Sequence, residues 1–448
     1  MSELDERLRS LIDTSAPRIT LEEVYALEEI NARPTTTSRR TRRARTRRPA
    51  TAVLVMVCAL ATIAVAGAVI ATSDNTTRSQ IAAGGKQQSG RTGAAAAGGC
   101  AGKAYVASGR DTVYVIDTAT GTVSNRIRVG NNPNSVAITP DGKHLYVTGS
   151  RAAPARRPDG VRKEARGLKF SRGPGFVRQA VGVVSVIDTA TDKVSSRIRV
   201  PGAPVTVVGV AINPDGKHAY LSYMGIDSGT ASSIKVTVIT TATGKVSSHF
   251  ADGTATGVFT PDGKHAYATN RGFDGTVLVI DTATGKVSSR ITVGTGAAQA
   301  GAITPDGKHL YVASRERDSD IGTVSVIDTA TGEASSRTHV GNNPSSVAIT
   351  PDGKHAYVTS GGFDGRVYVI DTATGVVSAL IPVGSLPDVV AITPDGTHAY
   401  VTNRFGGSIS VIDTATGVVS ALIPVGAAGD QLRGLAICPE PNARPRRP

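Results

Sequence analysis

Short runs of alternating apolar and polar residues recur along this chain and predict strands. In the most regular copy, one run reads Ala302-Ile-Thr-Pro-Asp-Gly-Lys-His-Leu-Tyr-Val312 and the next reads Gly322-Thr-Val-Ser-Val-Ile-Asp-Thr-Ala-Thr-Gly332. Alternation with a period of two is typical of strands. Pro-Asp-Gly-Lys and Asp-Thr-Ala-Thr-Gly are typical of the turns between strands. With a fourth run such as Lys286-Val-Ser-Ser-Arg-Ile-Thr-Val293, a unit therefore predicts four antiparallel strands.

The number of units indicates the architecture. Pro-Asp-Gly recurs at Pro140, Pro214, Pro261, Pro305, Pro351 and Pro394. The phrase Val-Ile-Asp-Thr-Ala-Thr recurs with its Asp at 117, 188, 281, 328, 371 and 413, and in altered form at Thr240. Four strands repeated about every 40 residues are typical of propeller blades.

The two ends of the repeat region are expected to meet. First strands are predicted near Val136, Val208, Gly257, Ala302, Val347, Val389 and Leu435. The first copy, 103–129, lacks a first strand, and the last, 435–438, is only a first strand. Joined, they complete a seventh blade. We therefore expect an all-β, seven-bladed β-propeller with four-stranded antiparallel blades over residues 100–438.

These motifs resemble the YVTN-type β-propeller repeat family, and we expect this chain to be a bacterial, membrane-anchored member of it. Its unit reads roughly Tyr-Val-Thr-Asn followed by a Val-Ile-Asp-Thr phrase. The tetrapeptide is intact at Tyr400-Val-Thr-Asn403, and Tyr267-Ala-Thr-Asn270 and Tyr357-Val-Thr-Ser360 are near matches. The resemblance implies the fold. It leaves the function open, because such repeats occur in surface proteins, in binding proteins and near lactonase-like enzymes.

The residues before the propeller predict a membrane anchor. Residues 50–72 carry no charge and are long enough to span a bilayer as a single transmembrane helix. Seven arginines among residues 39–48 favour a cytoplasmic position for the N-terminal side. We expect a short cytoplasmic tail (1–49), the helix (50–72), a flexible linker (73–99) and an extracytoplasmic propeller followed by a disordered C-terminal tail (439–448). Cleavage after Ala-Val-Ala at 64–66 is the alternative to an uncleaved anchor.

The cytoplasmic tail carries two short helical patterns. Leu4, Leu8 and Leu11 are spaced as on one helix face, and Thr20 with Glu23 can form a capping box. Two interpretations of residues 1–33 remain open. They are either a docking site for a cytoplasmic partner or a pair of marginal helices.

Positive charge is concentrated in one insertion of the propeller. The chain has a net charge of +13, and nine basic residues against two acidic ones lie between Ser150 and Val181. The insertion joins a second strand to a third, and its net charge of +7 favours anionic partners. Five of its basic residues are candidate ligand-face residues: Arg156, Arg157, Arg162, Lys163 and Arg166.

Aromatic residues extend this predicted ligand face. Phe273, Phe363 and Phe405 fall in loops between second and third strands, with Arg271 and Arg404 beside two of them. Exposed aromatic rings next to arginine can stack on a ligand or pack on a protein. In the alternative interpretation each Phe covers the edge of its own blade.

Two cysteines at the ends of the repeat region predict a disulfide. Aligning Tyr105 with Tyr146 places Cys100 where other repeats have the Asp of the Pro-Asp-Gly turn. The run Leu435-Ala-Ile-Cys438 matches Val-Ala-Ile-Thr, so Cys438 takes the place of the Thr. In an intact repeat those positions are two residues apart across one turn, which suits the Cα separation of a disulfide, and an extracytoplasmic location permits oxidation. Two buried cysteines without a bond are the alternative.

Signatures of common chemistry are missing from the sequence. It contains no serine-hydrolase elbow, phosphate loop, paired CxxC motif or zinc signature. The repeated histidines and aspartates are expected to spread around the ring without converging. We therefore expect no cofactor, no metal and no enzymatic activity.

The first functional hypothesis is a membrane-anchored binding module for a macromolecular or anionic partner at the cell surface or wall. A lactonase-like or other propeller enzyme is an alternative. It needs convergent polar groups at the ring centre, where first strands such as Val136-Ala-Ile-Thr offer small and apolar residues. A transmembrane sensor that relays to a cytoplasmic partner is the third possibility.

Overall fold

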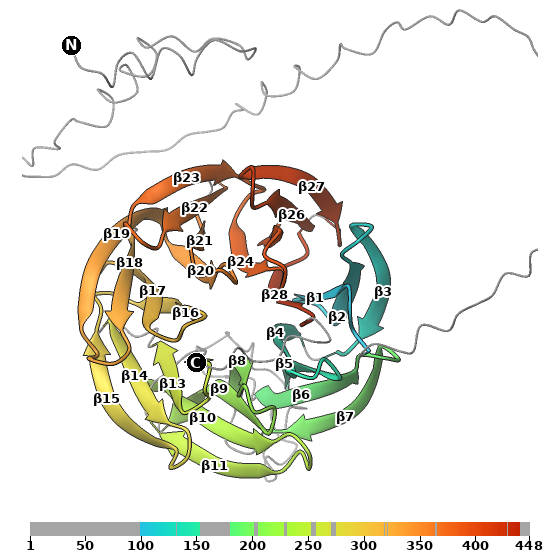
Figure 1. Ribbon diagram of the computed structural model, residues 1–448. Coiled ribbons are helices and arrows are strands. Elements are labelled where there is room, and N and C mark those ends of the chain that lie inside the picture. Colours follow the sequence, from blue (N-terminus) through green and yellow to red (C-terminus); the bar gives the residue numbers. More distant parts are fainter. Residues whose placement is uncertain are drawn as a thin grey trace, which may run out of the picture. The chain divides into compact units, whose positions relative to one another are not determined.

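The computed structural model describes residues 99–130, 132–152, 180–200, 205–227, 231–251, 257–269, 275–317, 319, 321–362, 365–427 and 429–439. They form seven four-stranded sheets arranged as blades around one axis (Figure 1). The predicted all-β, seven-bladed propeller is thus confirmed. Nearly all of the predicted tail, span and linker, 1–98, lies outside these ranges. Within them, no helix has the length and apolar character needed to cross a bilayer.

Each blade consists of an inner, a second, a third and an outer strand. The inner strands are β4 (Pro133–Ile138), β8 (Val205–Ile212), β12 (Gly257–Phe259), β16 (Ala298–Ile303), β20 (Pro344–Ile349), β24 (Pro387–Ile392) and β28 (Leu432–Ile437). The second strands are β1 (Lys103–Ser108), β5 (His144–Ala152), β9 (His218–Asp227), β13 (His265–Thr269), β17 (His309–Arg315), β21 (His355–Ser360) and β25 (His398–Asn403). The third strands are β2 (Thr112–Asp117), β6 (Ala180–Asp188), β10 (Ala231–Thr240), β14 (Thr276–Asp281), β18 (Ile321–Asp328), β22 (Arg366–Asp371) and β26 (Ser408–Asp413). The outer strands are β3 (Thr122–Arg128), β7 (Lys193–Arg199), β11 (Val246–Ala251), β15 (Lys286–Thr292), β19 (Ala334–Asn342), β23 (Val377–Pro382) and β27 (Val418–Pro424).

The connections of an antiparallel blade divide the ring into two faces. The Pro-Asp-Gly turns and the Asp-Thr-Ala-Thr turns lie at one end of the strands, which we call the turn face. Loops between second and third strands and the connections between blades lie at the other end, which we call the loop face. β5 and β6 are joined at their loop-face ends, and the insertion between them lies outside the described residues. The ladder of β5 and β6 extends to Ala152 paired with Ala180, so the insertion proper is 153–179, shorter than expected.

Side-chain bonds fix both kinds of turn. Thr139 donates its hydroxyl to Asp141 at 2.6 Å, and Gly142 adopts a φ of 69° that favours glycine. In the other turn, the backbone N–H of Thr120 donates to Asp117 at 2.8 Å. These bonds hold the pKa of the Asp117 carboxyl below its ordinary value. The expected structural role of the repeated Asp is therefore confirmed.

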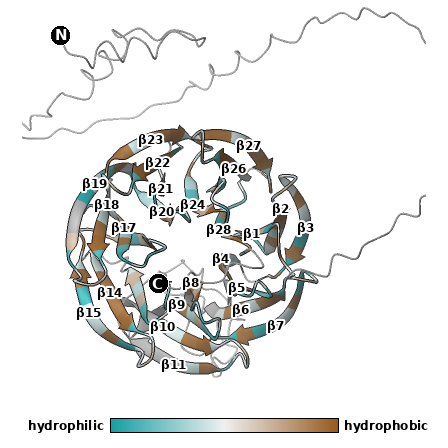
Figure 2. Ribbon diagram, in the orientation of Figure 1, coloured by the Kyte–Doolittle hydropathy of each residue, from teal (hydrophilic) through white to brown (hydrophobic). Residues whose placement is uncertain are grey.

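The core lies between neighbouring blades. Second and third strands are buried, whereas outer strands are largely exposed, and Figure 2 shows hydrophobic colouring on third strands such as β10 and β18. A tyrosine of the second strand reaches the next blade in several copies. Tyr146 donates to the carbonyl of Thr241 at 3.3 Å, and Tyr400 donates to that of Thr118 at 3.4 Å. The last contact joins the end of the repeat to its beginning.

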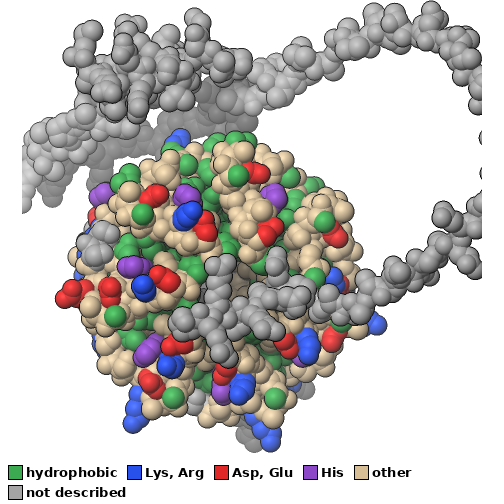
Figure 3. All heavy atoms as spheres, viewed as in Figure 1, with side chains coloured by type: hydrophobic (Ala, Val, Ile, Leu, Met, Phe, Trp, Pro, Cys, Tyr) green, Lys and Arg blue, Asp and Glu red, His purple; other side chains and the backbone are tan. Residues whose placement is uncertain are grey.

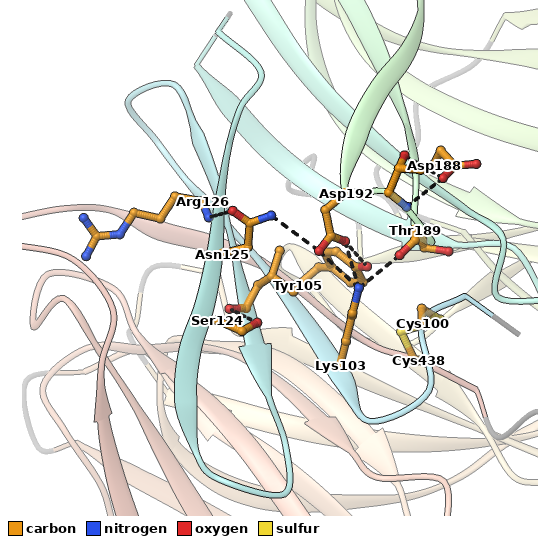
Figure 4. A network of polar contacts seen from close by, with 12 residues as sticks. Cys100, Lys103, Tyr105, Ser124, Asn125, Arg126, Asp188, Thr189, Asp192 and Cys438 are labelled. Atoms are coloured by element: carbon orange, nitrogen blue, oxygen red, sulfur yellow. Dashed lines mark hydrogen bonds and ion pairs between the residues drawn. A yellow bond between two sulfur atoms is a disulfide. The ribbon is translucent and has the colours of Figure 1, made fainter. Parts of the chain in front are cut away.

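The ring closes as the repeat count predicted. The β28 strand pairs with β1, so the seventh blade takes strands from both ends of the repeat region. The predicted disulfide is confirmed, since Cys100 and Cys438 are bonded with their Cα atoms 5.8 Å apart and 338 residues apart in sequence. It lies beside a polar network that joins the seventh blade to the first complete one (Figure 4).

That network depends on a departure from the repeat. Asp192 stands where other copies have a glycine, and it keeps the left-handed conformation with a φ of 53°. Its carboxylate accepts from Lys103 at 3.1 Å and from the Tyr105 hydroxyl at 2.9 Å (Figure 4). Burial, and secondarily the Asp192 charge, raise the pKa of Tyr105.

Candidate functional site

The structure describes two of the ten predicted ligand-face residues. Arg404 and Phe405 lie in the loop between β25 and β26, on the loop face. The Arg404 guanidinium carbon is 5.6 Å from the centre of the Phe405 ring, which is itself 43% exposed. A role for this pair in ligand binding stays a prediction. The other eight lie outside the described residues: Arg156, Arg157, Arg162, Lys163, Arg166, Arg271, Phe273 and Phe363.

A β-bulge at the start of the inner strands presents further polar residues on the loop face. In β4, Pro133 pairs with Gly149 and Ser135 with Thr148, so the residue between them is left out of the ladder. A bulge re-aims the side chain that it carries and often accompanies a functional site. The residue at this second position differs from copy to copy: Asn134, Val208, Gln299, Ser345, Asp388 and Arg433.

The inner strands begin earlier than expected from the sequence. Inner strands were expected to begin at the apolar Val-Ala-Ile-Thr phrase, and therefore to offer the ring centre only small and apolar residues. They begin about three residues earlier, and the added residues include polar and charged ones. The sequence did contain a sign of these polar residues, because one variable position stands beside the otherwise repeated Val-Ala-Ile-Thr phrase.

Four residues form what we call the inner-strand cluster: Asn134, Asp388, Arg404 and Arg433. Arg433 donates from Nη1 to Asn134 Oδ1 at 3.1 Å, which links the seventh blade to the first complete one. Its Nε donates to Gln431 Oε1 at 3.0 Å, and a second guanidinium nitrogen also contacts that oxygen. The backbone N–H of Leu432 donates to the carbonyl of Arg404 at 3.1 Å. The cluster is therefore held between three blades.

Arg404 is incompletely paired. Its Nε lies 4.0 Å from Asp388 Oδ2, close enough for an ion pair but too long for a hydrogen bond. The same nitrogen is buried without a hydrogen-bond partner. The Arg404 side chain as a whole is 38% exposed and that of Asp388 is 21% exposed, so the cluster is accessible to solvent.

The electrostatics of the cluster favour an anion. Burial lowers the pKa of Arg433, the neighbouring Arg404 charge lowers it further, and Asp388 opposes both effects. The charge of Asp388 thus acts on both guanidinium groups. A bound carboxylate or phosphate can accept from both arginines and relieve their repulsion.

The turn face presents a different pattern. Acidic, basic and histidine side chains repeat around it (Figure 3), with one histidine at the start of each of six second strands: His144, His218, His265, His309, His355 and His398. Among the residues that the structure describes, no three His, Cys, Asp or Glu side chains come close enough together to hold a metal ion. The charges that the structure describes on this face therefore do not gather into a metal-binding group.

Comparisons with known proteins support the propeller fold and indicate one related family. A family model described as "Lactonase, 7-bladed beta-propeller" matches residues 209–381, less than half of the chain. The chain is 32% identical over 110 residues to "Antigen Lp49" of Leptospira interrogans, and the match covers 25% of this chain and 20% of that protein. The chain thus spans about a fifth of the length of this curated relative.

Two solved structures resemble the propeller. One is the hydrazine synthase of Kuenenia stuttgartiensis, with 24% identity, a TM-score of 0.54, and coverage of 68% of this chain and 90% of that one. The other is a functionally unknown protein of Desulfotomaculum acetoxidans, with 16% identity, a TM-score of 0.56, and coverage of 76% and 99%. At these identities the similarity establishes the fold only.

Proposed function

We propose that this propeller is an extracytoplasmic, membrane-anchored binding module whose loop face recognises a carboxylate or phosphate group of a partner at the cell surface or wall. One observation carries the proposal. Arg404 lies beside Asp388 and its charge acts on Arg433, and Arg404 Nε is buried without a hydrogen-bond acceptor. The basic insertion, which follows the loop-face end of β5 in the sequence, adds long-range attraction for an anionic partner.

Titration of the full chain in detergent with glucuronate and with polyphosphate tests this proposal. Arg433→Gln and Arg404→Gln each remove a charge-assisted contact, which contributes about 1.5–3 kcal/mol, so we expect affinity to fall by roughly 10- to 100-fold. Arg128→Gln is the matched control, because it removes one positive charge from the outer strand of the seventh blade. Equal affinities of all three variants and the wild type would refute the site.

Lactone or ester hydrolysis is a second candidate, supported by the lactonase-type family match. In this reading, the two arginines stabilise the negative charge that develops on the carbonyl oxygen. Asp388 would accept a proton from the attacking water. A screen of lactones with the full chain tests the activity.

Asp388→Asn separates the two candidates. It removes the only negative charge of the cluster but keeps the shape of the side chain. Binding of glucuronate should be retained or become tighter, because the arginines lose their internal partner. Hydrolysis, in contrast, should be lost with its base. A variant that loses binding in parallel with hydrolysis would argue against Asp388 as a base.

The proposed topology rests on the uncharged stretch 50–72 and its arginine-rich flank. Protease added to intact cells should remove the propeller and spare a tag at the N-terminus. A propeller that is digested only after lysis would overturn the arrangement. Residues 1–33 would then face the cytoplasm, where a pull-down with 1–49 tests the sensor alternative.

A further inference from the structure

The outer strands of two neighbouring blades differ in chemistry from the other five. In five blades, two positions of the outer segment carry mainly charged residues. These pairs are Thr122 and Arg126, Lys193 and Arg197, Lys245 and His249, Lys286 and Arg290, and Glu333 and Arg337. The corresponding positions of the other two outer segments hold Val376, directly before β23, with Leu380, and Val418 with Leu422 in β27.

We call these four residues the apolar edge patch. Their exposed fractions are 61% for Val376, 42% for Leu380, 60% for Val418 and 62% for Leu422. The β27 strand has the same burial pattern as the charged β15 strand, so the blade itself does not require apolar residues here. Figure 2 shows more hydrophobic colouring along β23 and β27 than along β15.

The patch also lies on exposed sheet edges. β23 and β27 are the outermost strands of their sheets, and they follow one another along the rim (Figure 1). Charged side chains on an edge strand are a common protection against pairing with another chain. Five edges of this ring have that protection, and these two have lost it.

We propose that the apolar edge patch is the interface through which two copies of this chain associate. Residues 375–384 and 417–426 have the identical sequence Gly-Val-Val-Ser-Ala-Leu-Ile-Pro-Val-Gly. A two-fold axis that runs parallel to the two strands and midway between them sets β23 of one copy against β27 of the other. Val376 then faces Val418 of the partner subunit, and Leu380 faces Leu422 of the partner subunit. The same patch thus serves both copies, as a two-fold interface requires.

Charge disfavours the same two-fold arrangement between another pair of outer strands. A two-fold axis between β11 and β15 would set Lys245 against Lys286 of the partner subunit, and like charges directly opposite one another are destabilising. Between β23 and β27 the same geometry brings only aliphatic groups together. A second copy is therefore an occupant that the patch fits, whereas β11 and β15 would oppose two lysines.

The interface is small. A stable soluble complex buries about 20–30 residues on each side, whereas the patch offers four large side chains. We therefore expect weak association in dilute solution, which a proximity measurement detects better than a change in size.

Cross-linking of full-length chains in detergent tests the proposal. The third cysteine of the chain, Cys58, is replaced by serine in all variants. Because Cys100 and Cys438 are bonded to each other, each engineered cysteine is then the only free thiol. A tagged Val376→Cys chain is mixed with a differently tagged Val418→Cys chain and oxidised. The control mixture is Lys245→Cys with Lys286→Cys, the corresponding positions of another neighbouring pair of blades. We expect the patch mixture to form mixed dimers at least about tenfold faster than the control.

A second pair of changes tests the role of the apolar side chains. Leu380→Arg with Leu422→Arg, added to the patch mixture, should reduce cross-linking to the control rate. Four other blades carry arginine at this position, so the strands accommodate it, and an unchanged circular dichroism spectrum confirms folding. Equal rates in patch and control mixtures, or rates that the arginines leave unchanged, overturn the proposal.

Lipid is the competing occupant. The chain contains no tryptophan, so a single Leu422→Trp reports only on the patch, and Arg290→Trp is its control. Quenching of Leu422→Trp by a brominated detergent, well above that of the control, would show that the patch faces lipid and would overturn the dimer.

Discussion

The disulfide that closes the ring can be replaced by the side-chain hydrogen bond that other blades have at the same position. Five other turns hold a Thr–Asp hydrogen bond at this position, for example between Thr304 and Asp306 at 2.6 Å. Cys438 occupies the Thr position, since its backbone N–H donates to the carbonyl of Lys103, and Cys100 occupies the Asp position. We predict that Cys100→Asp with Cys438→Thr rebuilds the polar pair and loses only the covalent link.

The size of the effect follows from the length of the closed loop. The two cysteines are 338 residues apart, and the chain-entropy relation gives a stabilisation of about 6 kcal/mol for a loop of this length. The native ring keeps its other closing contacts, namely the β1–β28 ladder and the Lys103–Asp192 pair. The loss should therefore arise almost entirely from the unfolded chain, with about 6 kcal/mol as its upper limit.

Urea denaturation followed by circular dichroism measures this difference. The Asp/Thr variant should unfold at a clearly lower urea concentration than the oxidised wild type, and at nearly the same concentration as the reduced wild type. Cys100→Ala with Cys438→Ala, which lacks both link and polar pair, should be less stable than the Asp/Thr variant by about 1 kcal/mol. If the oxidised wild type and the Asp/Thr variant unfolded together, the ring would be closed by non-covalent contacts, and the entropy argument would be wrong.

Three further predictions concern the turns and the insertion. Asp192→Gly relieves a strained left-handed backbone but leaves the buried Tyr105 hydroxyl without its acceptor, so we expect a net loss of stability of about 1–2 kcal/mol. Asp192→Asn should lose less stability. Thermal unfolding of both variants measures the difference. Turn aspartates such as Asp371 have a lowered pKa, chiefly because the backbone N–H of Thr374 donates to the carboxylate. Their stabilisation is thus present above the ordinary carboxyl pKa and lost as the pH falls, so the melting temperature should drop below about pH 4, and a flat profile down to pH 2 would contradict this. Deleting residues 153–179 should leave the melting temperature unchanged and weaken polyphosphate binding most at low salt.

The fold was predictable because the turns and strands of each blade have nearly the same sequence. Pro and Gly set the backbone of one turn, and the repeated Asp accepts the N–H of the other. The closure was predictable for the same reason, since a repeat without its first strand and a lone first strand complete one another. The disulfide followed from comparing Cys100 and Cys438 with Asp141 and Thr139.

The inner-strand cluster was not predictable from the pattern of apolar residues. Alternation indicates where a regular ladder runs, and the bulge interrupts the ladder where Asn134, Asp388 and Arg433 stand. The pairing of Arg433 with Asn134 also joins residues 299 positions apart, which only the closed ring brings together. Likewise, the orphaned Nε of Arg404 depends on a distance of a few ångströms that no sequence pattern encodes.

Departures from the repeat can be sorted by whether the blade itself compensates for them. Asp192 takes a strained conformation in place of glycine, and bonds to Lys103 and Tyr105 offset that cost within the ring. Leu422 exposes 62% of its surface in place of a solvated arginine, and no contact of its own blade offsets that exposure, because the β15 strand shows that a charged residue fits the same position. A departure that the ring compensates concerns the stability of the ring. One that remains uncompensated at two neighbouring edges indicates a contact made beyond the single chain, which is why the apolar edge patch and not the Asp192 network carries the inference of a partner.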